Sequence, residues 1–262
     1  MSLIKTVQSG DYHWDVYATE RDEFLLSLEI TNIDSEKSTA DLEWDMGSVI
    51  GKSEEYVMAF RFAARVAIFE RKIWTLKTTA RIEDAGAIFC FKSAGYLTGR
   101  EFGSGSSRRL RLSCDRYDLV RKIAETEMGK HLDMSVWRFG WDSAKRRLGV
   151  CKYAEKLISL SRYFVDLHSL DEIHQVILHE VAHAIAGSNA GHGKKWKDTA
   201  TKLGYRHKKI SGDEIGNATA KLVGTCPNGH INYRHRKPKT PLSCGKCSTR
   251  FDNRYLITWA TR

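Results

Sequence analysis

Hydrophobic and polar positions alternate in several segments of the first half of the chain. The ranges 24–31, 40–45, 73–80 and 87–91 combine this alternation with β-branched or aromatic residues, which predicts four strands. Ser53, two acidic residues and a largely apolar run to residue 72 predict a capped helix that packs on a sheet. We therefore expect an α+β domain here, with a packing or interaction role.

The pattern changes after residue 116. A helical periodicity over 117–130 is followed by three short strand-like segments at 136–141, 147–153 and 156–161. Ser169 and Glu172 then form a capping-box pattern, which predicts the start of a helix. Its apolar positions run to Ile185, and Gly187 is expected to end it. A second α+β region with a small sheet is the expected result.

Two breaks in composition divide the chain. The segment 103–107, Gly-Ser-Gly-Ser-Ser, has the composition of a flexible linker. All three prolines lie beyond residue 226, in a stretch rich in Cys, Arg and Lys. We therefore expect three domains, over residues 1–112, 113–205 and 206–262.

Charge follows the same division. Residues 1–115 hold 15 basic and 18 acidic side chains (net −3), and residues 116–262 hold 27 and 14 (net +13). Residues 203–262 alone carry 12 Lys or Arg against three acidic side chains. This surplus suggests a polyanionic partner, and nucleic acid is the commonest one, although a solubilising basic tail has the same composition.

The sequence shows no signal-peptide or membrane-helix pattern. The N-terminus lacks the apolar stretch of a signal peptide, and no run approaches the 18 or so apolar residues of a membrane helix. We expect an intracellular, soluble protein with no membrane partner, in the cytoplasm or nucleoid, or in the nucleus of a eukaryote. Six cysteines are too few for a disulfide scaffold, and three crowd into the last forty residues, which favours metal binding there.

The helix after Ser169 contains His179-Glu180-Val181-Ala182-His183. Because four residues make just over one helical turn, both imidazoles project from one face and can bind a single zinc ion. Glu180 lies beside them and is the candidate catalytic acid and base for a water molecule. The alternative is a pair of histidines that form hydrogen bonds in a polar core and bind no metal.

A catalytic zinc needs a third protein ligand and one open position. His192, between Gly191 and Gly193, is the best candidate because these glycines let the chain turn back to the metal. The metzincin pattern requires glycine at 186 and histidine at 189, but the chain has Ala186 and Asn189, so that subgroup is excluded. Peptide hydrolysis is the reaction that this set of residues favours.

The terminal segment contains a second set of metal-ligand types. Cys226-Pro-Asn-Gly-His230 and Cys244-Gly-Lys-Cys247 are two tight turns with two candidate ligands each, which predicts a closed Cys₃His structural zinc site. His235 is an alternative to His230 as the fourth ligand. A short basic segment with little apolar content needs such a site to fold.

Cations and aromatic residues are interleaved around these turns. The candidate nucleic-acid contacts are Arg234, Arg236, Lys237, Lys239, Arg250 and Arg254. Tyr233, Phe251 and Tyr255 lie among them, and rings mixed with cations suit stacking on bases together with phosphate contact. DNA, with single strands or distorted duplex as the bound form, is the predicted partner, against a solvated basic hairpin as the alternative.

Several strings in family order resemble the SprT-like zinc metalloprotease family. They are WRFGWDSAKRRLGVCKY, KLISLSRYF, ILHEVAHAIAG, GHGKKW, CPNGH, YRHR and SCGKC, spread over residues 116–262. The resemblance implies a zincin-like metalloprotease domain with a small sheet and an HExxH helix, zinc ligands His179, His183 and His192, catalytic Glu180, and a C-terminal zinc ribbon. It implies one catalytic and one structural Zn²⁺.

Eukaryotic Spartan members of this family digest proteins crosslinked to DNA, so the resemblance implies DNA-protein crosslink repair and protein substrates. Residues 1–112 fall outside it. Two other functions stay open: a nucleic-acid-associated adaptor or regulator without proteolytic activity, and hydrolysis of a non-peptide substrate. The presence of Glu180 beside the histidines favours an enzyme, because a purely structural site needs no general base.

Overall fold

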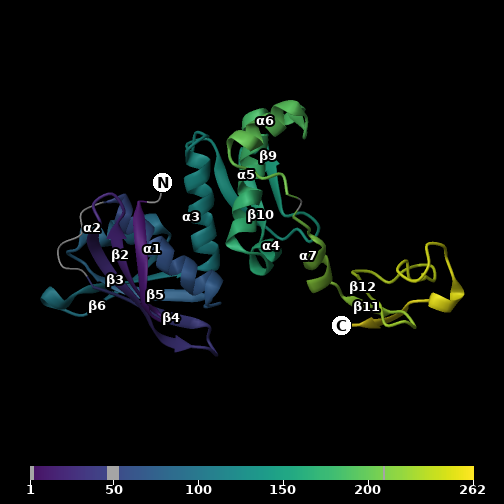
Figure 1. Cartoon of the computed structure of the whole chain (residues 1–262), viewed down its shortest axis with the longest axis horizontal. Helices are drawn as coiled ribbons and strands as arrows, with labels where there is room; N and C mark the ends of the chain where they lie inside the picture. Colours follow the sequence, from purple (N-terminus) through teal and green to yellow (C-terminus); the bar gives the residue numbers. More distant parts are fainter. Residues whose placement is uncertain (1–2, 46–52, 209) are drawn as a thin grey trace. The chain divides into compact units, whose positions relative to one another are not determined.

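The computed structural model describes residues 3–45, 53–208 and 210–262. It separates the chain into two compact units, Met1–Phe139 with Ser169–Ile177, and Gly140–His168 with Leu178–Arg262. Each unit mixes helices with sheet (Figure 1). The prediction of a mixed α+β protein is therefore confirmed.

The first unit is built on a seven-stranded sheet. Its strands in spatial order are β1 (Ile4–Gly10), β2 (His13–Ala18), β3 (Glu23–Asp34), β4 (Thr39–Asp45), β5 (Thr75–Arg81), β7 (Arg109–Asp115) and β6 (Leu97–Phe102). Strands β4 and β5 run parallel and pair over three residue pairs. Beyond that ladder, Thr78 Oγ1 donates to the Leu42 carbonyl (2.8 Å) and Trp44 Nε1 to the Thr79 carbonyl (3.2 Å). These side chains hold the two strands together where the backbone no longer does.

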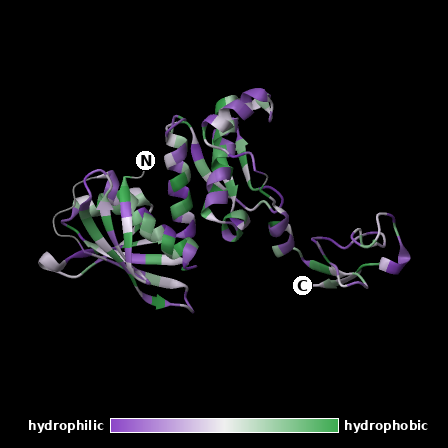
Figure 2. Cartoon of the chain, viewed as in Figure 1, coloured by the Kyte–Doolittle hydropathy of each residue, from purple (hydrophilic) through white to green (hydrophobic). Residues whose placement is uncertain are grey.

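The helices described in this unit are α1 (Glu54–Arg65, continued by a π-helical turn, Val66–Glu70), α2 (Ala85–Ala94), α3 (Arg116–Gly129) and the first part of α5 (Leu170–Ala186), up to Ile177. Ser53 caps α1 as predicted, because its side chain accepts the Tyr56 N–H. The buried rings of Phe60 and Phe91 stack at 3.7 Å between the helices and the sheet. Hydrophobic and hydrophilic residues alternate along the strands, so only one face of the sheet is apolar (Figure 2).

One predicted strand in this unit is wrong. Residues 87–91 lie in α2, whose first turn is capped by Asp84 and whose last turn ends at Gly95 in the left-handed region (φ 116°). The apolar run in this segment is five residues long, a length that suits a buried strand or a buried helix equally well. The capping residues on both sides of the run, Asp84 and Gly95, favour the helix.

The Gly-Ser segment 103–107 does not link domains. It forms the turn between β6 and β7, and β7 pairs with β5 over seven residue pairs inside the first sheet. The expected boundary after residue 112 therefore cuts through a strand. A flexible composition suits a hairpin turn as well as a linker, and the strand-like residues on both sides decide for the turn.

The second unit contains two small sheets. One has the order β8 (Arg138–Asp142), β10 (Leu157–Ser161) and β9 (Gly149–Lys152), and the other the order β12 (Ile231–Arg234), β11 (Leu222–Thr225) and β13 (Thr258–Thr261). Its helices are α4 (Arg162–Leu167), α6 (Lys194–Lys202), α7 (Asp213–Ala218) and the end of α5 (Leu170–Ala186). The strands expected within 136–141, 147–153 and 156–161 and the helix expected over 117–130 are confirmed, with ends shifted by up to a few residues. Residues 206–262 belong to this unit, and a separate terminal domain stays a prediction.

Candidate metal centre and its surroundings

Helix α5 carries the two motif histidines, and a capping box fixes its start. The Glu172 N–H donates to Ser169 Oγ (3.3 Å), and the Ser169 N–H donates back to the Glu172 carboxylate (3.1 Å). At the other end Gly187 adopts a left-handed φ of 90°, which few other residues tolerate. The predicted start and stop of this helix are confirmed.

The side chains of His179, His183 and His192 converge on one point. Their Nε2 atoms are separated by 3.2 Å (His179 to His183), 3.1 Å (His183 to His192) and 3.2 Å (His192 to His179). The chain returns to the helix through a 3₁₀ turn and Gly191, whose φ of 50° is left-handed. From the sequence, the glycines beside His192 were expected to let the chain turn back toward the helix. In the structure, the ring of His192 does lie beside those of His179 and His183.

Three ring nitrogens at these distances suit a shared cation. A neutral imidazole has a single N–H, so three mutually adjacent Nε2 atoms cannot all be joined by good hydrogen bonds. Ligand nitrogens about 2.0–2.1 Å from a tetrahedral zinc ion lie about 3.3–3.4 Å from one another, close to the separations found here. The donor set therefore fits zinc.

The rings are held in the form that binds a metal. Burial, and then the charges of His183 and His192, lower the pKa of His179 to about 4. Burial and His192 lower the pKa of His183 to about 4. Both rings are neutral at pH 7, and each keeps a lone pair. The buried Trp196 lies against all three, with ring centroids 4.6–5.3 Å from theirs.

Glu180 lies on the same helix with its carboxylate almost fully enclosed. The residue is 6% exposed. Burial raises its pKa to about 8, and the backbone N–H of Cys151 and the charge of Arg147 oppose that rise. The hydrogen bond from Cys151 ties the carboxylate to strand β9. A carboxyl with a pKa near neutrality is suited to taking and returning a proton.

Strand β9 reaches this carboxylate because residue 149 is glycine. A Cβ built on Gly149 would lie 3.0 Å from both Cγ and Oε1 of Glu180 and 2.9 Å from Cδ2 of Leu160. Real Cβ atoms essentially never show contacts under 3.0 Å, so a larger residue would have to displace a neighbour. β9 is also an edge strand, because it pairs with β10 alone among the residues that the structure describes.

Four ligand atoms converge in the terminal segment. Cys226 Sγ lies 3.6 Å from His230 Nδ1 and 3.7 Å from Cys247 Sγ, and His230 Nδ1 lies 3.2 Å from Cys247 Sγ and 3.6 Å from Cys244 Sγ. Zinc–sulfur bonds of about 2.3 Å place two ligand sulfurs about 3.8 Å apart in a tetrahedral site. This cluster could hold a metal, and its histidine is His230, whereas His235 is not among the four.

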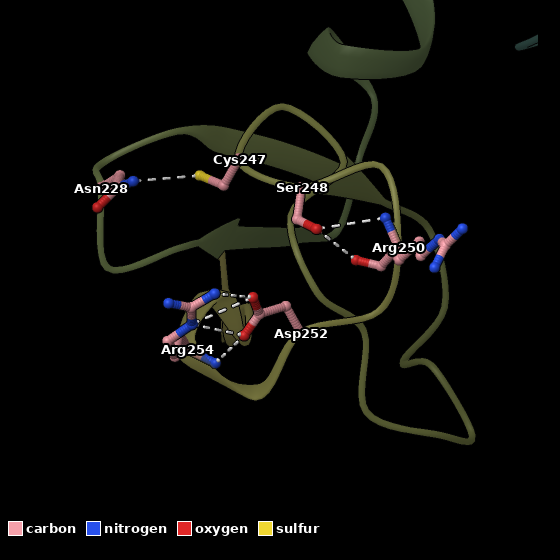
Figure 3. A network of polar contacts seen from close by, with 6 residues as sticks. All are labelled: Asn228, Cys247, Ser248, Arg250, Asp252 and Arg254. Carbon is pink, nitrogen blue, oxygen red and sulfur yellow. Dashed lines mark hydrogen bonds and ion pairs between the residues drawn. The ribbon is translucent and has the colours of Figure 1, made fainter.

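The surroundings of these sulfurs shift the pKa values of Cys244 and Cys247 in opposite directions. Burial raises the pKa of Cys244, but hydrogen bonds from the backbone N–H groups of Lys246 and Cys247 outweigh it and lower the pKa to about 6. Asn228 Nδ2 donates to Cys247 Sγ (3.4 Å; Figure 3). Gly229, with a left-handed φ of 77°, makes the first turn possible. Metal ligation requires deprotonated cysteine. The contacts of Cys244 promote this form, whereas burial and the hydrogen bonds with Cys244 and Cys226 raise the pKa of Cys247 to about 11.

The basic candidates of this segment differ in their partners. Arg254 is held by Asp252, with Nη2 2.8 Å and Nε 3.1 and 3.2 Å from its carboxylate oxygens (Figure 3). The Arg234 guanidinium lies over the Trp259 ring, 5.9 Å from its centroid. Arg236, Lys237, Lys239 and Arg250 are exposed. Of the six cations, Arg254 therefore already has an acidic partner.

Several residues of the site were not found from the sequence. Gly149, Cys151, Trp196 and Tyr205 surround the histidines or Glu180, and the Tyr205 ring lies 5.4 Å from that of His179. Trp196 lies in GHGKKW, and Gly149 and Cys151 lie in WRFGWDSAKRRLGVCKY; both strings carry the family resemblance, but neither assigned these residues a role. The contact between Gly149 and Glu180 depends on the packing of a strand against a helix, and no local motif marks it.

Three histidines that could hold a metal ion converge on the helix that carries the buried Glu180. Residues 118–215 match the model of the SprT-like family, a metallopeptidase-like family, and the resemblance drawn from the motifs is confirmed over this segment. The match contains His179, Glu180, His183 and His192, and it ends before Cys226. No curated protein matches the chain. Within residues 3–45, 53–208 and 210–262, no helix has the length and apolar character needed to cross a bilayer.

Solved structures with some similarity are acetyltransferases. A spermidine N-acetyltransferase SpeG chimera from Vibrio cholerae and hSSAT is 9% identical at a TM-score of 0.36, over 41% of this chain and 68% of its own. A ribosomal-protein-S5-alanine acetyltransferase from Vibrio fischeri is 7% identical at 0.35, over 39% and 60%. A GNAT-family acetyltransferase from Bacillus anthracis is 10% identical at 0.35, over 41% and 68%. At TM-scores below 0.5, these similarities support no inference about this chain.

Proposed function

We propose that the protein is a zinc-dependent endopeptidase that acts on DNA-bound or DNA-crosslinked proteins, with a zincin-like catalytic domain. The convergence of three Nε2 atoms within 3.2 Å of one another, on the helix that carries Glu180, is the observation that supports it most. His179, His183 and His192 would hold the catalytic ion. Three protein ligands leave a fourth position for water or substrate, as catalytic zinc sites require.

When bound, zinc acts as a Lewis acid that lowers the pKa of water toward about 7 and polarises a carbonyl group. Glu180 is the general base in this proposal. Its carboxylate takes a proton from the attacking water and later delivers it to the leaving amine. The buried position of Glu180 keeps bulk water away from that proton, and the Cys151 N–H fixes the orientation of the carboxylate.

The substrate would be an extended peptide. Among the described residues, β9 pairs with β10 alone, so its other edge has no strand partner there, and its Cys151 N–H donates to Glu180. A peptide that pairs along this edge lies next to the general base. Main-chain pairing accepts many sequences, which suits an enzyme whose protein substrates differ from one another.

The second metal would be structural. Cys226, His230, Cys244 and Cys247 fill all four positions of a tetrahedron and leave none for a substrate. We therefore propose one catalytic and one structural Zn²⁺ in each chain. A zinc ribbon of this kind holds the basic C-terminal residues in place for a DNA partner, in agreement with the net charge of +13 over residues 116–262.

The test is cleavage of a DNA-binding protein by zinc-loaded wild type and by Glu180→Gln, with and without single-stranded DNA. Glu155→Gln is the matched control, because it removes an equal charge from an exposed pair with Lys152 in the same unit. We expect Glu180→Gln to keep two zinc ions and to lose about 10²–10⁴-fold in turnover, while the control cleaves normally.

Undiminished cleavage by Glu180→Gln would refute the assignment of the general base. Binding of DNA without cleavage by the wild type would instead favour a zinc-containing adaptor. Cleavage that does not respond to DNA would leave a peptidase but remove DNA from its function.

A further inference from the structure

A cavity of about 660 Å³ lies on the seven-stranded sheet of the first unit. Its lining comes from β4, β5, β6 and β7, with Asn32 of β3 at one side. Leu76 and Ala80 of β5 point to the other face of the sheet, where they share the buried core with Phe60 of α1 and Phe91 of α2. The cavity therefore opens on the face that these helices do not cover, and we call it the sheet cavity.

The two walls of the sheet cavity carry opposite charges. The acidic wall is Asp41 and Glu43 of β4, and the basic wall is Lys77 of β5, Arg100 of β6 and Arg111 of β7. In the order of the sheet, β5 is the first strand beyond β4 and β7 is the second. Because neighbouring strands lie about 4.8 Å apart, a ligand that contacts both walls needs a cationic and an anionic group about 5–10 Å apart.

The acids are held away from the basic wall. Asp41 and Lys77 are partners in the parallel register of β4 and β5, yet they form no salt bridge in the described part of the chain. Neutral side chains of β3 hold both carboxylates instead. Asn32 Nδ2 donates to Asp41 Oδ2 (3.1 Å), and Thr31 Oγ1 donates to Glu43 Oε1 (3.0 Å). These contacts leave the negative charge of the acidic wall uncompensated.

The basic wall is likewise left without an acidic partner. The Arg111 guanidinium lies over the Phe102 ring of β6, 5.2 Å from its centroid. Glu101, the acidic residue of β6, is paired with Arg108. None of the three cations of the basic wall forms a salt bridge within the described residues. Opposite charges on nearby strands attract one another, so separate partners are needed to keep the walls apart. A ligand therefore meets two charged walls that are already in place, which lowers the cost of binding.

We propose that the sheet cavity binds a short peptide by its two charged ends, the ammonium group on the acidic wall and the carboxylate on the basic wall. An extended chain spans about 3.3–3.6 Å per residue, so two or three residues span about 7–11 Å, close to the separation of the walls. Arginine is suited to a terminal carboxylate because its planar guanidinium donates two parallel hydrogen bonds. The volume of the cavity is typical of sites for small ligands.

The mixed charge of the cavity disfavours simpler ligands. A polyanion would meet the carboxylates of Asp41 and Glu43, and a metal cation would meet the three cations opposite them. A ligand with one charge of each sign satisfies both walls. This inference concerns the first unit, is independent of both metal clusters and goes beyond the proposed function.

The test is calorimetric titration of trialanine into the full zinc-loaded chain that carries Glu180→Gln, so that hydrolysis adds no heat. N-acetyl-trialanine lacks the ammonium group, and trialanine amide lacks the carboxylate. We expect each blocked peptide to bind about 10-fold more weakly than trialanine, because each loses one contact between charged groups.

Two variants assign the ends of the peptide to the walls. Arg111→Gln should lose about 10-fold in affinity for trialanine and nothing for the amide, and Glu43→Gln should lose about 10-fold for trialanine and nothing for the acetylated peptide. Arg109→Gln and Glu29→Gln are the matched controls. Arg109 lies two residues before Arg111 on β7, Glu29 is the register partner of Glu43, and both are exposed and outside the lining of the cavity. Both controls should bind trialanine like the parent chain.

No binding of trialanine at millimolar concentration, or equal binding of the three peptides, would overturn the proposal. Binding that ignores both Arg111→Gln and Glu43→Gln would place the peptide elsewhere, for example at the histidines, and would overturn it too. Self-association of the chain that Arg111→Gln abolishes, without binding of trialanine, would show that a second copy covers this face. Each of these results leaves the test of Glu180 in protein cleavage unaffected.

Discussion

For the proposed zinc peptidase, the close approach of Gly149 to Glu180 predicts that Gly149→Ala loses activity and keeps zinc. The added Cβ would lie 3.0 Å from Cγ and Oε1 of Glu180 and 2.9 Å from Leu160 Cδ2. A normal contact between carbon atoms needs about 3.5–4.0 Å, so Glu180, Leu160 or β9 must move by about 0.5–1 Å. Because Gly149 does not adopt a left-handed φ, the backbone itself tolerates alanine.

The size of the effect follows from the role of the carboxylate. A general base contributes about 10²–10⁴-fold to the rate, and a displacement of about 1 Å can cost about 10²-fold. We therefore expect turnover to fall about 10²-fold, with two zinc ions retained. Crowding in the sheet should also lower the free energy of unfolding by about 1–3 kcal/mol. Peptide cleavage, zinc content and urea unfolding measure the three quantities.

Gly140→Ala is the matched control. Gly140 lies on β8 of the same sheet, and a Cβ there would meet only Leu157 Cδ1, at 3.1 Å. This variant should lose stability to a similar or smaller extent and keep its turnover. Normal turnover in Gly149→Ala, or an equal loss in both variants, would contradict the idea that the glycine positions Glu180.

Two further predictions concern stability. If the chain binds the two proposed zinc ions, Cys244→Ser should reduce the zinc content to one ion and make residues 222–262 sensitive to proteolysis, since the cluster would lose a ligand; metal analysis and limited digestion measure this. The hydrogen bond from His174 leads the contacts that lower the pKa of the buried Glu127 to about 2, against an ordinary 4.5. The ionised Glu127 carboxylate therefore contributes about 2–3 kcal/mol to the free energy of unfolding above pH 4.5, and this contribution is lost as the pH falls through 2. Urea unfolding should show Glu127→Gln to be less stable than the wild type at pH 6 and equally stable at pH 2.

The elements that the sequence predicted well are those with local signals. The helix caps at Ser53 and Ser169 and the stop at Gly187 depend on neighbouring residues, and the structure confirms all three. The segment 87–91 and the turn 103–107 were assigned wrongly because apolar runs and Gly-Ser composition do not specify one structure. In such segments pairing with distant strands, or a cap outside the run, decides the outcome.

The same distinction applies to the site. His179, Glu180 and His183 share one helical turn, so their spacing alone predicted that they meet, and the glycines beside His192 predicted its return. The partners of Glu180 could not be found in this way. Gly149 and Cys151 lie about thirty residues earlier, and their contact with the helix depends on the register of β9 and on how the sheet packs.

The net charge of the sequence does not tell how many cations are unpaired in the folded chain. A count of Lys and Arg treats all cations of residues 116–262 alike, but the fold pairs Arg147 with Asp142 and Arg254 with Asp252. Paired cations release few counterions and add little to the affinity for a polyanion. Arg146 and Arg236 remain unpaired within the described residues. The affinity for DNA should therefore depend on which cations the fold leaves unpaired, and the salt slope should report that smaller number rather than the total charge.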